Sequence, residues 1–164
     1  MKATIKEEKH MRKFEMIKQE ELAKLGYSVP NNYLLPQRGS SHSAGYDFRT
    51  PFDITIKAHE SYVVPTLCKA SMENDEVLLI IIRSSMAMKR HITLTNQVGV
   101  IDSDYYSNPD NDGHIMISLT NNSDSDITLK SGERIAQGIF VKYNITDDDN
   151  NTEQRMGGIG STGK

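Results

Sequence analysis

The sequence predicts an all-β fold, either a sandwich or a barrel, from three observations. From Tyr33 onward, short β-branched or aromatic runs alternate with clusters of Gly, Pro, Asn and Ser, as in strands joined by tight turns. The number and spacing of these runs favour a sandwich or barrel over alternating βαβ units. The chain has 164 residues, of which 37% are hydrophobic and 25% charged, which suits one domain with a sizeable core.

A short helix is expected near the N-terminus, between Glu15 and Leu25, and Gly26 is expected to end it. Glu20 lies four residues before Lys24, a spacing that supports a helix. The apolar residues of this segment fall on one helical face, and they are Met16, Ile17, Leu22 and Leu25.

The strands expected after this helix are residues 53–56, 62–64, 77–82, 92–95, 114–119, 126–129 and 139–143. Residues 144–154 contain almost no apolar side chain, which is typical of an exposed linker of up to about 35 Å. The expected organisation is therefore an N-terminal extension with a helix (1–32), a β-barrel (33–143), and a linker with a flexible glycine-rich C-terminal arm (144–164).

Charge and cysteine content exclude several classes of protein. The net charge of −3 gives no broad positive field for sequence-independent nucleic-acid binding. Any polyanion that binds must therefore be small and must be bound by a local group of residues, with a metal ion. The single Cys68 excludes an intramolecular disulfide and a Cys-rich zinc site, and indicates a core thiol in a reducing cytoplasm. The longest apolar run, Val77–Ile82, is far shorter than the ~20 residues of a membrane-spanning helix, so no membrane association is expected.

Two segments contain polar residues suited to ions or phosphates. Gly45 permits a close backbone approach beside Asp47, whose carboxylate can face a hydrated cation. Arg83, Ser84 and Ser85 directly follow the most apolar run, and a guanidinium with two hydroxyls suits phosphate oxygens. Each segment alone is equally explained as a turn at a strand end.

Residues 96–105 are the richest segment. They suggest a strand, a bend assisted by Gly99, a carboxylate at Asp102 and an aromatic ring at Tyr105. Such a carboxylate can act as a general base toward water, although an Asp that ends a strand and a core Tyr explain the segment equally well. Further along, Gln137 falls inside an apolar strand, where its amide needs hydrogen-bond partners.

The chain ends in GIGSTGK, the front of a phosphate-binding P-loop without the helix that a P-loop requires. Its glycines, hydroxyls and cation still suit phosphate oxygens, although glycine-rich termini are often only disordered. The five histidines form no ligand pair at zinc-binding spacing, and no G-x-S-x-G elbow indicates a serine hydrolase.

Taken together, SAGYD, RSSMA, NQVGVIDSDY, GERIAQ and RMGGIGSTG resemble, in order, the five motifs of the homotrimeric dUTP pyrophosphatase (dUTPase) family. The resemblance covers about residues 34–164, and the insertion-like residues 106–114 are similar to Gram-positive bacterial and phage versions. It implies a jelly-roll β-barrel, a homotrimer with active sites at subunit interfaces, and Mg²⁺-dependent hydrolysis of dUTP to dUMP and pyrophosphate. This reaction limits uracil incorporation into DNA and supplies dUMP for dTMP synthesis.

The resemblance also implies roles for individual residues. Asp102 would activate the attacking water, and Tyr105 would pack beneath the deoxyribose. The residues that would bind deoxyuridine are Asn96, the backbone of Val100, Ile101 and Asp102, and the main chain near Met116. The residues that would contact phosphates or the attacking water are Arg83, Ser84, Ser85 and Gln137, with Asp47 holding a water of the Mg²⁺ shell. The arm residues that would close over the nucleotide are Arg155, Ile159, Gly160, Ser161 and Thr162.

Two departures from the family pattern are visible. Ile159 stands where an aromatic residue is usual, so base stacking is weaker or comes from elsewhere, and His114 is one substitute to consider. Tyr105 is followed by Tyr106 and Ser107 rather than by Arg and Gly, so the contact of that Arg is missing.

Two alternative functions remain open from the sequence. One is the related dCTP deaminase, which shares the fold; the complete arm and the Tyr105 hairpin argue against it. The other is binding of a host regulatory protein, as some phage relatives do, through residues 1–32 or 107–112.

Overall fold

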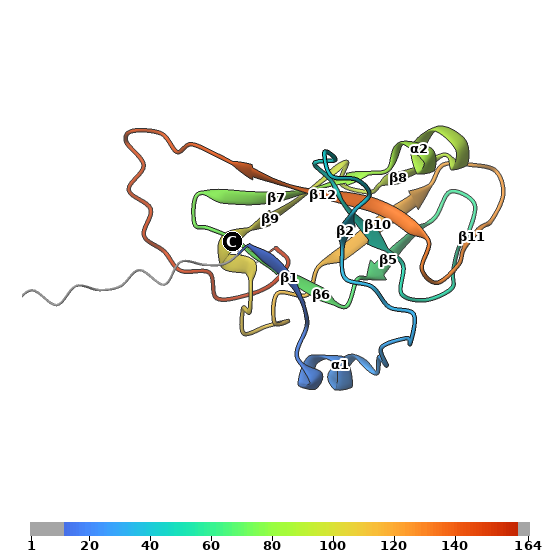
Figure 1. Cartoon of the computed structure of the whole chain (residues 1–164), viewed down its shortest axis with the longest axis horizontal. Helices are drawn as coiled ribbons and strands as arrows, with labels where there is room; N and C mark the ends of the chain where they lie inside the picture. Colours follow the sequence, from blue (N-terminus) through green and yellow to red (C-terminus); the bar gives the residue numbers. More distant parts are fainter. Residues whose placement is uncertain (1–11, 161–164) are drawn as a thin grey trace, which may run out of the picture.

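The computed structural model describes residues 12–160 and confirms the all-β class (Figure 1). The strands are β1 (Lys13–Met16), β2 (Gln37–Arg38), β3 (Tyr46–Arg49), β4 (Ile54–Ile56), β5 (Ser61–Pro65), β6 (Cys68–Ser71), β7 (Glu76–Ile82), β8 (Ile92–Leu94), β9 (Val98–Asp102), β10 (Met116–Asn121), β11 (Ile127–Leu129) and β12 (Arg134–Lys142). The helices are α1 (Gln19–Leu25), α2 (Ser84–Arg90) and the 3₁₀ turn η1 (Ser103–Tyr105). No helix within residues 12–160 is long and apolar enough to cross a bilayer.

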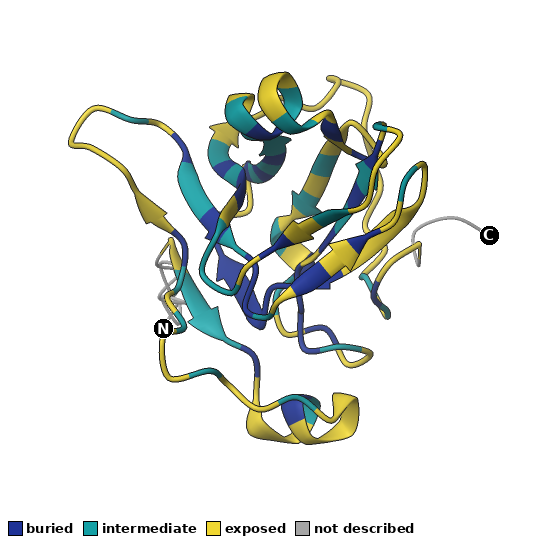
Figure 2. Cartoon of the chain, turned by 90° about the vertical axis from the view of Figure 1, so that its right-hand side faces the viewer, coloured by how far each residue is buried: buried dark blue, intermediate teal, exposed yellow. Residues whose placement is uncertain are grey.

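The strands form antiparallel sheets around one main core. A five-stranded sheet has the order β2-β3-β12-β7-β9, and a three-stranded sheet has the order β5-β10-β8. Two-stranded ladders join β1 to β6 and β4 to β11. Leu78 and Ile80 of β7 share a single buried cluster with Ile117 and Leu119 of β10. The buried residues lie mainly on the strands, whereas α1 is set apart from the sheets and is mostly exposed (Figure 2).

Strand β7 has two different faces because side chains alternate along a strand. Leu78 and Ile80 point into the core, while Leu79 and Ile81 lie half-buried on the other face. The register places Val100 of β9 opposite Leu79. Val98 and Val100 are 43% and 59% exposed, so the outer face of this sheet is apolar and partly open in the single chain.

The N-terminal segment differs from its prediction in one respect. The helix ends before Gly26 as expected, with Gly26 at φ 71°, but it begins at Gln19 rather than at Glu15. Lys13–Met16 instead forms β1, paired with β6. Pairing and ring packing override the helical spacing here: the Phe14 ring lies 5.3 Å from Tyr46 and 5.4 Å from Phe140, centroid to centroid.

Further elements also went unpredicted or were assigned differently, namely α2, β2, β3 and β6. Arg83, Ser84 and Ser85 were expected at a strand-end turn, but Arg83 is the N-cap of α2 and both serines lie in its first turn. Strands β3 and β6 are too short and too polar to show a clear periodic pattern, and only their pairing with neighbouring strands identifies them as strands.

Cys68 is buried as predicted, and burial raises the pKa of its thiol to about 11.

The Phe14→Ala variant tests whether the N-terminal segment contributes to the stability of the main core. Because Phe14 is partly buried against this core and contacts three aromatic rings, its truncation is expected to lower the free energy of unfolding by about 2 kcal/mol, measured by urea denaturation. Ile145→Ala, at a residue that is exposed, is the matched control and should change stability little. Equal stability of the two variants would show that β1 adds nothing to the core.

Candidate active site

A pocket of about 370 Å³ lies between β8, β9, η1, β10 and the C-terminal arm. Most of the predicted nucleoside and arm residues line it, namely Asn96, Val100, Ile101, Asp102, Tyr105, Met116, Arg155, Ile159 and Gly160. Ser161 and Thr162 lie outside the described residues. The pocket therefore unites residues that are more than 60 positions apart in sequence, counted from Asn96 to Gly160.

Tyr105 is fixed in one orientation. Its ring is buried, its hydroxyl donates to the carbonyl oxygen of His114 at 2.8 Å, and Asn111 Nδ2 donates to that hydroxyl at 2.8 Å. Burial raises the pKa of the phenol, so the hydroxyl stays protonated near neutral pH. Tyr105 thus gives the pocket a rigid aromatic surface.

Asp102 lies at the end of β9, and its side chain is 52% exposed. Arg155 of the arm donates from Nη2 to Asp102 Oδ2 at 2.6 Å and from Nε to Asp104 Oδ1 at 2.8 Å. The same guanidinium lies 5.7 Å from the centroid of the Tyr105 ring. The arm is therefore bound at the pocket by its only arginine, next to the predicted general base.

Strand β9 offers free backbone groups to the pocket. It is the last strand of its sheet, and within residues 12–160 it pairs only with β7, so its second edge presents unpaired N–H and C=O groups. A Cβ on Gly99 would lie 3.0 Å from Ile80 Cβ, tighter than ordinary contact. Gly99 therefore lets the strand lie close against β7.

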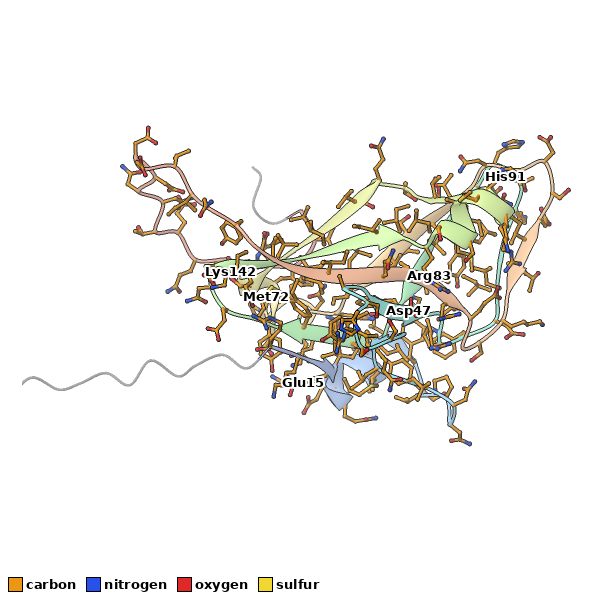
Figure 3. The ribbon with its side chains drawn as sticks, turned by 45° about the horizontal axis from the view of Figure 1, so that its top comes forward. Glu15, Asp47, Met72, Arg83, His91 and Lys142 are labelled. Atoms are coloured by element: carbon orange, nitrogen blue, oxygen red, sulfur yellow. The ribbon has the colours of Figure 1, made fainter. Side chains whose placement is uncertain are left out.

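A second cluster holds the remaining predicted residues on β3, β12 and the start of α2. Arg83 Nε lies 3.1 Å from Asp47 Oδ1, and the two side chains point toward one another (Figure 3). Arg134 Nη1 lies 3.2 Å from Asp47 Oδ2. Gln137 is paired with Asp47 across the strands, and a Cβ on Gly45 would collide with Gln137 Oε1. Sequence reasoning missed Arg134, although it lies in the GERIAQ segment.

The two clusters lie at opposite ends of β7. Asp102 is paired with Val77, whereas Arg83 follows Ile82 at the other end. Arg83 is six residue steps along the chain from Val77, which corresponds to roughly 20 Å. Arg83 also extends toward Asp47 on β3, away from β9. One chain therefore cannot bring Arg83 and Asp102 to the same phosphate group.

The residues present fit a hydrated Mg²⁺ ion, and not one held directly by protein ligands. Among the described residues, no three His, Cys, Asp or Glu side chains group as a metal site. Both oxygens of Asp47 already contact arginines. Mg²⁺ keeps several waters and takes phosphate oxygens with one or two carboxylates, which suits a water-mediated contact with Asp47.

His114 does not replace the missing aromatic residue of the arm. Its side chain is fully buried beneath the pocket wall, and its Nε2 accepts a hydrogen bond from the backbone N–H of Leu67 at 3.1 Å. Burial lowers the pKa of the imidazole to about 4. The proposal of His114 as a stacking partner is therefore wrong, because its ring is fully buried and does not line the pocket. Ile159 is exposed at the pocket rim.

Fold and site together define a jelly-roll β protein whose pocket combines a free backbone edge, a tyrosine and an exposed carboxylate. The model of the dUTPase family matches residues 31–163. A deoxyuridine 5'-triphosphate nucleotidohydrolase from Lactococcus lactis is 43% identical over 145 residues, covering 84% of this chain and 97% of that protein. One from Haemophilus ducreyi is 34% identical, covering 91% and 99%.

Solved structures agree with this assignment. The crystal structure of a dUTPase from Streptococcus mutans superposes with a TM-score of 0.73 at 40% identity, covering 83% of this chain and 99% of that one. A dUTPase from phage phi11 of S. aureus, at 17% identity and a TM-score of 0.67, shares the fold over 87% of this chain and 97% of that one. The chain belongs to the dUTPase family, which confirms the resemblance of its five motifs.

The buried imidazole of His114 predicts a pH-dependent stability. Its pKa falls from 6.5 to about 4 on folding, so as pH drops below 6.5 the unfolded chain takes up a proton that the folded chain does not. Stability is therefore lost as pH falls from 6.5 toward 4, by about 2 kcal/mol between pH 7 and pH 5 from this residue.

The measurement is urea denaturation of the parent and of His114→Gln at both pH values. The variant should lose about 2 kcal/mol less than the parent on acidification, whatever its absolute stability. Parallel losses in the two proteins would contradict the assignment.

Proposed function

We propose that this member of the dUTPase family hydrolyses dUTP to dUMP and pyrophosphate with Mg²⁺, through a water activated by Asp102 that attacks the α-phosphorus. Family membership makes the chain a dUTP diphosphatase, a hydrolase of nucleotide metabolism. The observation that supports the detailed mechanism is the position of Asp102, an exposed carboxylate at the edge of a pocket built from backbone and Tyr105.

The pocket suits a uracil base. The free edge of β9 from Val100 to Asp102, together with Asn96 and the main chain near Met116, offers fixed donors and acceptors. Cytosine presents the reversed pattern and would leave these groups unpaired, at about 1–3 kcal/mol each. The locked Tyr105 ring packs beneath the deoxyribose and leaves no room for a 2′-hydroxyl.

The phosphates are neutralised from several sides. Arg83, Ser84, Ser85 and Gln137 contact phosphate oxygens or the attacking water, and Asp47 would hold a water of the Mg²⁺ shell. Bound Mg²⁺ supplies charge neutralisation, which this reaction needs more than covalent chemistry. Asp102 takes the proton of the water as it attacks.

The arm closes over the nucleotide. Arg155 forms ion pairs with Asp102 and Asp104, and a triphosphate offers the guanidinium a denser negative charge. Arg155, with Ile159, Gly160, Ser161 and Thr162, then shields the phosphates from bulk water. Release of Asp102 from its ion pair frees this carboxylate to act as a base.

The geometry of β7 supports a homotrimer with sites at subunit interfaces. Within one chain the two clusters are roughly 20 Å apart. Arg83 and Asp102 can lie close together in one site if they come from different copies. The half-open apolar face that includes Val98 and Val100 supplies surface for such contacts. The buried Cys68 thiol is consistent with a reducing cytoplasm, where removal of dUTP limits uracil incorporation into DNA and supplies dUMP for dTMP synthesis.

The assignment of the base is tested with Asp102→Asn. The variant should release pyrophosphate from dUTP roughly 10³-fold more slowly than the parent while still binding a non-hydrolysable dUTP analogue, since an amide cannot accept the proton. Asp104→Asn is the matched control, because Asp104 also pairs with Arg155, and it should keep most turnover. The proposal would be contradicted if Asp102→Asn hydrolysed dUTP as fast as the parent. It would also be contradicted if the parent hydrolysed dCTP, dTTP or UTP as fast as dUTP.

The shared site is tested by mixing subunits. Arg83→Ala and Asp102→Asn chains are each expected to be nearly inactive, but random co-assembly should restore about a quarter of the sites, which combine an intact Arg83 from one copy with an intact Asp102 from another. Pyrophosphate release by co-expressed chains measures this. Activity no greater than the sum of the two single variants would place both residues of a site on one chain.

A further inference from the structure

We propose that residues 106–113, the seat loop, form a binding seat for the C-terminal arm, with Asp110 as the positioning residue that receives the arm at Gly158. The inference rests on the proposed function, since it assigns the seat a role in closing the dUTP site. After β12 the chain loops outward and returns beside the segment that follows β9 (Figure 1).

The contact at Gly158 is specific. Its backbone N–H donates to Asp110 Oδ2 at 3.2 Å, and the residue is buried. A Cβ at this position would lie 2.7 Å from Asp110 Oδ2 and 3.1 Å from Asn111 Nδ2. A side chain at position 158 would therefore have to displace the Asp110 carboxylate, whereas Gly160 has φ 76° and no heavy atom near its Cβ position.

The seat loop is rigid and is joined to the floor of the pocket. Asn108 Oδ1 accepts from the backbone N–H groups of Asp110 and Asn111 at 3.0 and 3.2 Å. Asn108 Nδ2 donates to the carbonyl oxygen of Tyr105 at 2.8 Å. Asn111 donates to the Tyr105 hydroxyl at 2.8 Å. The seat for the arm and the surface proposed to carry the deoxyribose are therefore one hydrogen-bonded unit.

The N-terminal segment supports the seat loop from outside. Buried Asp112 accepts from Lys69 Nζ at 3.0 Å and from the backbone N–H of Lys18 at 2.7 Å. Lys24 Nζ donates to the carbonyl oxygen of Asp110 at 3.1 Å. Tyr106 donates to Glu15 of β1. These contacts assign residues 15–24 a supporting role that the sequence did not reveal.

The arm is thus held at two points three residues apart, by Arg155 on Asp102 and Asp104 and by Gly158 on Asp110. Phosphates compete for the first point, because they attract the guanidinium. The second point has no charge on the arm side and can persist during closure. It therefore sets where Ile159 and Gly160 lie over the pocket, and holding them there lowers the entropy cost of closing the site.

The test uses a fluorescent reporter on the full-length chain. The sequence has no Trp, so Met156→Trp, at a position 78% exposed, provides a single reporter on the arm. Asp110→Ala and Gly158→Ala are each introduced beside it. The matched control is Asp124→Ala, whose carboxylate is 98% exposed and pairs with His59 far along the chain.

Without nucleotide, the tryptophan anisotropy of the reporter chain should fall when Asp110→Ala or Gly158→Ala is added. It should not change when the control substitution Asp124→Ala is added. For dUTP, kcat/KM should fall about tenfold in both, mainly through KM, with an unchanged thermal unfolding midpoint. The double variant should lose no more than the worse single one, because removal of the carboxylate makes room for the new methyl group.

Parental anisotropy and kcat/KM in Asp110→Ala would overturn the seat, and so would additive losses in the double variant. Failure of the proposed function gives a different result. A parent chain that does not hydrolyse dUTP contradicts the enzyme assignment, whereas the anisotropy of the reporter chains still decides whether Asp110 binds the arm.

Discussion

Strand β7 is the constraint on which the rest of the structure depends. Its buried face, with Leu78 and Ile80, locks it into the core between β12 and β9, and its register and length then place Asp102 and Arg83. Asp102 lies opposite the first residues of the strand and Arg83 follows its last. Because a strand is extended and stiff, the chain cannot fold these groups together, and this separation is the reason that the proposed site takes Arg83 and Asp102 from different copies.

A second organising contact is the hydrogen-bonded unit around Tyr105. The ring and the seat loop share direct hydrogen bonds, and Asp112 and Tyr106 join that loop to the N-terminal segment. Residues outside the five motifs therefore support the geometry within them. The arm contacts both the motif carboxylates and the seat loop, so the position of the arm depends on residues outside the five motifs.

The fold class and most strands could be predicted, because strands such as β7, β8 and β11 show their apolar pattern locally. Prediction failed where tertiary contacts override the local signal. Met16 fits a helical face, yet pairing with β6 makes it the last residue of strand β1. His114 looked available as a pocket residue, yet its ring is buried against Leu67. Arg134 joined the site only because β12 pairs with β3 and brings it to Asp47.

The sequence by itself determined the family, the all-β class and the chemical types of the site residues, because ordered motifs and alternating apolar runs are local properties of the chain. Only the tertiary structure decided which of these residues meet. It joined Asn96, Tyr105 and Arg155 in one pocket and separated Arg83 from Asp102. Strand register and the return path of the arm decide such distances, and both arise from contacts between residues far apart in sequence.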